Sequence, residues 1–354
     1  MSRRKTLQSK FLGSLLFMLP FLIIFLFPSI TLADPVILYT DILSGPNTGG
    51  ENNNGAYLSI FGKGFGTTRG TSKVTINGVE VATYKQWGTQ SRVYDSHGIQ
   101  VISVQPGVNV TSGPIVVTVN GENSNSDHTF TVKPGDIYFV ALDGNDITGE
   151  AGNFNKPFRD VHKTFHRSDF GPGDLIAVRG GTWTDIGDSS DSRWFEIDKG
   201  ATSADPFIIY GYPGEEVIYD HANGAAHIAG AYTGTNYIFE GFVFANFKFI
   251  NAIESTFALG RGGDGGNLYD GKPFHNYVRI VNIEIAGPPG GSCAPDAGSI
   301  EASRTHHVKI LGVYVHDRDI GCPNPPKYSG AKAIYFTART HDGEVGWFTV
   351  QNLQ

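Results

Sequence analysis

The chain has 354 residues, of which 40% are hydrophobic and 17% charged, and it contains 46 glycines, 24 phenylalanines and 15 tyrosines. This composition excludes a disordered chain, a collagen and a coiled coil. At ~100 to 200 residues per domain, the length predicts two domains behind any leader. Abundant glycine and aromatic residues with few charges favour turn-rich β structure, so we expect an all-β protein.

The first 33 residues have the pattern of a secretory signal peptide. Four basic residues among the first ten precede an apolar run over residues 11–27, and the segment ending at Ala33 suits cleavage before Asp34. The alternative is an uncleaved N-terminal anchor. In both cases we expect the rest of the chain to be secreted or held at the cell surface, with no later segment that spans a membrane.

The charge of the exported part argues against nucleic acid as a partner. Without residues 1–33 the chain keeps 23 basic and 34 acidic residues, a net charge of −11. Binding to phosphates needs a basic stripe, and the sequence has no run of Lys and Arg.

Short alternating strands are expected in the hundred residues after the leader. Apolar and polar residues alternate over residues 57–60, 73–76, 99–102 and 114–119. Between them, Asn77-Gly78 and Asn120-Gly121 suit tight hairpin turns. The pattern predicts a β-sandwich over residues 34–134.

This segment resembles the IPT/TIG immunoglobulin-like domain. The resemblance rests on residues 58–66, 74–78, 112–119 and 130–132, which read LSIFGKGFG, VTING, SGPIVVTV and FTV. It implies a spacer or a carbohydrate-facing accessory module with no chemistry of its own.

From residue 135 onwards a loose repeat predicts a β-solenoid. Residues 158–170 are expected to form one short helix, residues 173–182 and 208–220 the first coils, and residues 226–228 and 299–302 a third side. The final apolar residues of four strands lie 41, 30 and 35 residues apart; they are Phe244, Ile285, Val315 and Val350. Gly or Asn tolerates the left-handed backbone that stacked coils need at a corner. Trp347 stands at the corner of the last unit and leaves its register open.

These coils resemble the right-handed parallel β-helix superfamily that includes pectate lyases, over residues 135–354. The expected fold class is therefore an immunoglobulin-like β-sandwich followed by a right-handed parallel β-helix. The sequence stops directly after an apolar strand without a capping element, so we expect an incomplete β-helix and a fragment of a longer protein.

Cys293 and Cys322 are the only cysteines. Their separation of 29 residues is close to one 30-residue coil, which would place them in neighbouring stacked loops. An exported protein lets them form a disulfide. A metal site is the weaker alternative because the sequence has no CxxC pair.

The loops around these cysteines carry the densest polar cluster of the sequence, from Asp296 to Lys332. The resemblance implies a lyase that uses Ca²⁺ and a Lys or Arg base on uronate polysaccharides, because a cation must stabilise the developing carbanion. It then implies Asp296, Asp317 and Asp319 as metal ligands, Lys332 or Arg304 as the catalytic base, and Glu301, His307 and His316 as substrate-binding residues.

Two other interpretations stay open. Charged residues in exposed loops are commonly solvated or paired, and no complete lyase signature matches these positions. A polygalacturonase-type hydrolase would need carboxylates flanking the scissile bond, and the Asp-Asp and Gly-His-Gly segments of that family are missing from the sequence. We therefore expect an exported polysaccharide-binding protein, and if it is an enzyme, a lyase acting on uronate-containing polymers. The alternative is a non-catalytic cell-surface or adhesin-like protein.

Overall fold

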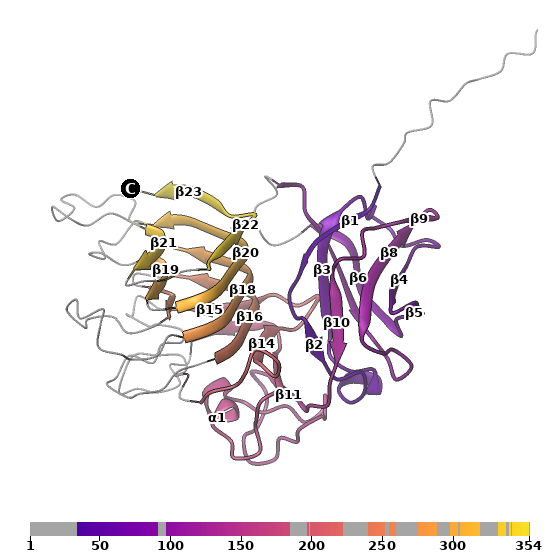
Figure 1. The fold of residues 1–354 in the computed structure, drawn as a ribbon. Helices are drawn as coiled ribbons and strands as arrows, with labels where there is room; N and C mark the ends of the chain where they lie inside the picture. Colours follow the sequence, from indigo (N-terminus) through magenta and orange to yellow (C-terminus); the bar gives the residue numbers. More distant parts are fainter. Residues whose placement is uncertain are drawn as a thin grey trace, which may run out of the picture. The chain divides into compact units, whose positions relative to one another are not determined.

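The described part of the chain begins with two facing β-sheets whose strands are almost all antiparallel (Figure 1). The structure is a computed structural model that describes residues 34–90, 97–184, 197, 199–221, 240–251, 255–259, 275–288, 298–303, 305–318, 332–337, 340 and 342–353. One sheet has the order β1 (Val36–Thr40), β3 (Leu58–Lys63), β7 (Gln100–Gln105) and β6 (Thr83–Gln90). The other contains β2 (Ser44–Gly45), β10 (Thr129–Val132), β8 (Gly113–Val119), β4 (Lys73–Ile76) and β5 (Val79–Glu80), with β9 (Glu122–Asn123) beside β8 and a 3₁₀ turn at Glu51–Asn53 outside the sheets.

The predicted strands and hairpins of this sandwich are confirmed. In β8 buried residues alternate with more exposed ones, as expected of a strand with one face on the core. Asn77 and Gly78 have φ values of 49° and 79°, and Asn120 and Gly121 have 52° and 93°. Two successive positive φ values define the hairpin turn whose twist matches the flanking strands.

The second part of the chain is a parallel β-helix, in which strands of successive coils pair in register (Figure 1). A short helix, α1 (Val161–Phe165), packs near its start and is shorter than the expected range of residues 158–170; the side chain of its N-cap residue Asp160 accepts a hydrogen bond from the Lys163 N–H. The long sheet contains β11 (Ile137–Val140), β12 (Leu175–Val178), β14 (Phe207–Gly211), β16 (Glu240–Ile250), β18 (His275–Ala286), β20 (Thr305–Arg318) and β22 (Glu344–Gly346), with β13 (Gly181–Trp183), β15 (Val217–Asp220) and β23 (Thr349–Leu353) beside them. A third side consists of β17 (Phe257–Leu259), β19 (Gly298–Ser303) and β21 (Lys332–Thr337).

Each of four successive coils turns at two left-handed residues that lie five positions apart. Such residues bend a strand sharply, and stacking requires the bend at the same place in every coil. Their φ values lie between 52° and 69°, and the pairs are Gly241 and Asn246, Tyr277 and Asn282, His307 and Gly312, and Asp342 and Trp347.

This double corner corrects the predicted repeat. The strand register aligns Phe249, not Phe244, with Ile285, so the first coil is 36 residues long rather than 41. Gly241 stands at the first of the two corners of its coil, not at the second. The misalignment of Phe244 arose because apolar residues alternate in the same way on both sides of each corner. Trp347 does stand at the second corner, because Gly346 pairs with Leu311 and Thr349 with Tyr314.

Two apolar cores follow from this arrangement. One fills the interior of the β-helix, with fully buried residues such as Phe244, Ile280 and Ile310. The other is shared, because outward-facing residues of the long sheet, including Tyr210, Val281 and Leu311, pack with the sandwich core. The sandwich is thus seated on the β-helix within the unit Ala33–Gln354. Among the described residues, no helix is long and apolar enough to cross a membrane.

Candidate functional site

The predicted site residues lie on three different faces of the β-helix. His316 and Asp317 lie near the end of β20, His307 near its beginning, and Glu301 and Lys332 on the three-stranded sheet. The single cluster expected from the sequence is therefore not formed by these residues, because each coil turns its loops and strands to different sides. Outside the described residues lie Asp296, Arg304, Asp319, Cys293 and Cys322.

His316 is the centre of a half-buried ionic network, which we call the His316 cluster. Its Nδ1 lies 2.7 Å from Asp317 Oδ2, and its Nε2 lies 3.1 Å from Glu284 Oε1. Lys248 Nζ is 3.0 Å from the same Glu284 oxygen, and the ring of Tyr314 stacks on His316 at 4.2 Å. Lys248, Glu284 and Tyr314 occupy equivalent positions in successive coils, so the parallel register brings them together.

The network shifts the pKa of both central groups. Burial favours the neutral imidazole, but the hydrogen bonds with Glu284 and Asp317 outweigh it and raise the pKa of His316. Burial likewise opposes ionisation of Glu284, yet hydrogen bonds with His316 and Lys248 lower its pKa overall. The cluster therefore favours an imidazolium beside a carboxylate.

Glu301 and Lys332 share the outer part of the three-stranded sheet with Tyr335. Glu301 pairs in register with Tyr335, and it accepts a hydrogen bond from Ser255 Oγ at 3.3 Å. Lys332 Nζ lies 4.5 Å from the centroid of the Tyr335 ring, a cation–π geometry. This group contains Lys332, one of the two predicted bases, but none of the predicted metal ligands among the described residues.

A row of outward-facing side chains, the ladder face, follows the first corner across three coils. The register aligns Arg279 with Lys309 and Lys309 with Glu344, which places Tyr277, His307 and Asp342 in line two positions earlier. Lys309 Nζ lies 2.6 Å from Glu344 Oε2. All six side chains, together with Leu43 and Ser44 of the sandwich, line a cavity of about 210 Å³.

Tyr277 is the unusual residue of this face. Its φ of 56° is in the left-handed region, which is costly for a bulky side chain, yet 39% of the residue is exposed. Its ring lies nearly parallel to that of His307, with 4.5 Å between centroids and 15° between planes. Strain retained at an exposed position points to a role other than stability.

The sequence interpretation missed most residues of these two groups. These residues lie in strands and corners, whereas the prediction rested on charged loops; they are Lys248, Glu284, Tyr277, Lys309 and Asp342. The five-residue spacing between corners was the available signal. Aligning the coils on Asn246, Asn282 and Gly312 would have placed Tyr277 beside His307.

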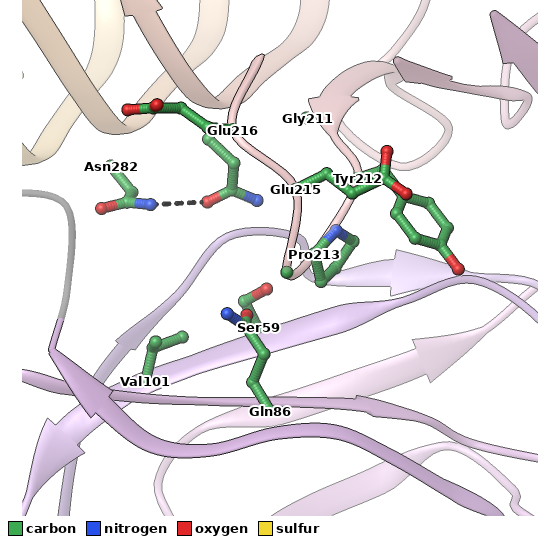
Figure 2. Close-up of a pocket in the computed structure, with 11 residues that line it drawn as sticks. Ser59, Gln86, Val101, Gly211, Tyr212, Pro213, Glu215, Glu216 and Asn282 are labelled. Atoms are coloured by element: carbon green, nitrogen blue, oxygen red, sulfur yellow. Dashed lines mark hydrogen bonds between the residues drawn. The ribbon is translucent and has the colours of Figure 1, made fainter. Parts of the chain in front are cut away.

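A polar pocket lies where the sandwich meets the β-helix (Figure 2). Ser59, Gln86 and Val101 form one wall, and the turn from Gly211 to Glu216 forms another. The dashed line in Figure 2 is the hydrogen bond from Asn282 Nδ2 to Asn246 Oδ1, 2.9 Å long. Glu215 is bound to Arg179, with 2.6 Å between Oε1 and Nη2. Because these polar groups already have partners, the pocket fits a role in docking the sandwich better than ligand binding.

The calcium site that the resemblance implies lies mostly outside the described residues, which hold one of its three predicted ligands. Ca²⁺ takes six to eight oxygen ligands. Asp317 is the only predicted ligand that is described, and its carboxylate is engaged with His316. We therefore assign no step to calcium.

Comparisons with known proteins find only distant structural likenesses. No family model matches the chain, and no curated protein matches it. Among solved structures, it is similar to a rhamnogalacturonan lyase, with 12% identity over 60% of this chain and 62% of that one and a TM-score of 0.33. It is also similar to pectate lyase Pel9A, with 13% identity over 62% of both chains and a TM-score of 0.33. It is similar as well to the GH136 lacto-N-biosidase from Eubacterium ramulus, with 13% identity over 62% of this chain and 34% of that one and a TM-score of 0.28.

The matched region spans about 62% of the length of the two lyases. At these identities and TM-scores the likeness carries no conclusion about a reaction.

Proposed function

We propose that this chain is an exported polysaccharide-binding protein that holds its ligand on the ladder face of the β-helix. The observation that carries the proposal is Tyr277, an exposed aromatic residue kept in a strained backbone conformation and stacked beside His307. The flat ring offers an apolar surface to the C–H face of a sugar. Lys309, Asp342 and Glu344 offer hydrogen-bonding groups to its hydroxyls.

The spacing of the coils supports a polymeric ligand. Parallel strands lie ~4.8 Å apart, a distance similar to the length of one pyranose residue. A glycan that runs along the β-helix axis would meet one side chain of the row for each sugar. A single sugar would use only one step of this repeated surface.

The charges of the ladder face favour a neutral or weakly charged glycan. Arg279 is engaged by the sandwich, since its Nη2 donates to Thr40 O at 2.8 Å. Of the remaining groups, Lys309 is paired with Glu344, and Asp342 adds a second carboxylate. A polyuronate would meet no excess of positive charge here.

Binding measurements on the mature protein test this proposal. Neutral polysaccharides, pectin and alginate would be compared by affinity electrophoresis and calorimetry, using the wild type, Tyr277→Ala and the control Tyr335→Ala on the three-stranded sheet. We expect Tyr277→Ala to weaken binding about tenfold or more, equivalent to about 1.4 kcal/mol, with Tyr335→Ala unchanged. Loss of binding only in Tyr335→Ala would place the site on the other sheet. Absence of binding to every polymer would favour a non-carbohydrate surface role.

The His316 cluster supports lyase activity as a second candidate. In β-elimination, a base removes the proton next to the uronate carboxyl, the bond to the leaving sugar oxygen breaks, and a carbon–carbon double bond forms. An imidazolium fits the role of acid to the leaving oxygen, because its pKa is raised by Glu284 and Asp317. Unsaturated product would be followed by absorbance, with His316→Gln as the variant. Equal activity of the wild type and His316→Gln would exclude the His316 cluster as the acid. If no uronate gave unsaturated product, polysaccharide binding without cleavage would remain as the function.

A further inference from the structure

We propose that His306, His307 and Asp342 form a binding site for a divalent transition-metal ion at the edge of the ladder face. Their ligand atoms, one from each residue, all lie within 4.8 Å of one another. The inference goes beyond polysaccharide binding and does not depend on it.

The fold itself brings these donors together. His307 and Asp342 occupy the first corner of consecutive coils, and both have a φ of 54°. His306 precedes His307 in the chain, and the two Nδ1 atoms lie only 2.7 Å apart. The left-handed corner turns neighbouring side chains toward one point, which an extended strand would send to opposite faces.

The donor set matches the chemistry of zinc and similar ions. Two imidazole nitrogens and one carboxylate are ligands that Zn²⁺, Cu²⁺ and Ni²⁺ accept, and three protein ligands leave a position open. With Zn–N bonds of ~2.0 to 2.1 Å, two nitrogens of a tetrahedral site lie about 3.4 Å apart. The two Nδ1 atoms must therefore separate slightly when a metal ion binds, while the ring of His307 stays stacked on Tyr277.

The surroundings favour a cation. Tyr277 stacks on the ring of His307 and limits its orientation. Lys309, a basic side chain of the ladder face, is paired with Glu344, with 2.6 Å between Nζ and Oε2. Asp342 supplies the carboxylate of the donor set.

Zinc titration of untagged mature protein, with no polysaccharide present, tests the site. Calorimetry should show one Zn²⁺ per chain, and His307→Ala and Asp342→Asn should each weaken its affinity about tenfold or more. His316→Gln, which removes a histidine from the other cluster, should leave the affinity unchanged. Co²⁺ substitution should give the visible absorption of a four-coordinate site, and this absorption should be lost in His307→Ala.

Two results would overturn the proposal. One is the absence of zinc binding to the wild type, and the other is equal binding by the wild type and both ligand variants. Because Asp342 and His307 are exposed, these variants are expected to fold, and their thermal unfolding would be recorded alongside. Failure of polysaccharide binding would leave the metal result untouched.

Discussion

The carboxylate of Asp41 in the sandwich accepts a hydrogen bond from Asn246 Nδ2 in the β-helix, 2.9 Å away across 205 residues of sequence. Asn246 Oδ1 in turn accepts from Asn282 Nδ2 at 2.9 Å. Because an ionised carboxylate only accepts hydrogen bonds, it fixes the orientation of both amides. The asparagine corners of the β-helix are thus ordered by a residue of the sandwich.

Asp41 should make stability depend on pH. Burial raises its pKa to about 6, although hydrogen bonds from Ser59, Asn246 and Ile42 act in the opposite direction. A carboxyl with a raised pKa stabilises the folded state most below its unfolded pKa, and that contribution is lost as pH rises toward about 6. Relative to Asp41→Asn, the wild type should lose about 2 kcal/mol of unfolding free energy between pH 4 and pH 7.

Urea unfolding at several pH values would measure this difference, with Asp143→Asn at an exposed position as the control. The nearby Arg279, which interacts electrostatically with Asp41, stays charged over this range. Parallel pH profiles for the wild type and Asp41→Asn would show that Asp41 does not titrate as described.

Tyr277→Asn should separate stability from binding. Asparagine tolerates the left-handed backbone, so relief of strain at φ 56° should raise the unfolding free energy by about 1 kcal/mol. The same change removes the exposed ring and should abolish the polysaccharide contact. Thermal unfolding and binding would be measured on the same preparation, and a clear loss of stability would mean that the ring is needed for packing.

Gly312→Ala should be strongly destabilising. A Cβ at this position would lie 2.0 Å from the Tyr39 hydroxyl of the sandwich, and the residue has a φ of 62°. Gly121 is the matched control, because its φ is also positive while nothing lies within 4 Å of its Cβ position. We expect Gly312→Ala to cost about 1 to 3 kcal/mol more than Gly121→Ala in urea unfolding. Equal costs would mean that Tyr39 moves aside freely.

Glu284→Gln should lower the pKa of His316. The carboxylate stabilises the imidazolium through the 3.1 Å contact, and glutamine removes that charge. A raised histidine pKa gives stability that is present below its unfolded pKa and lost as pH rises through the folded value. NMR titration of His316 would follow the shift, with Glu301→Gln as a control on another sheet. An unchanged titration midpoint would contradict the role given to Glu284.

Much of the architecture could be predicted from the sequence because strand alternation and corner residues are local signals. Asn77-Gly78 indicated its hairpin directly, and Asn282 and Gly312 marked two corners of the β-helix. The predicted alignment used Phe244 in place of Phe249, because the strand segments before and after a corner carry the same pattern of apolar residues. The pairing of Cys293 with Cys322 stays a prediction, which mass mapping of non-reduced peptides would test.

The candidate sites were harder to predict because they depend on stacking between coils. Lys248 and Glu284 are 36 residues apart, and only the parallel register makes them neighbours. The contact between Arg279 and Thr40 depends on how the sandwich is seated, which no local pattern records. The sequence analysis placed the candidate site in the charged loops because the density of polar residues was the signal available for it.

Hydrogen exchange with and without a bound polysaccharide would show directly whether the ladder face binds the polymer. We predict that a polymer selected in the binding panel slows exchange in the peptides covering residues 275–281, 305–311 and 342–346, while those covering residues 298–303 and 332–337 are unaffected. Protection confined to the three-stranded sheet, or none at a saturating concentration of polymer, would contradict the assignment of the ladder face as the binding site.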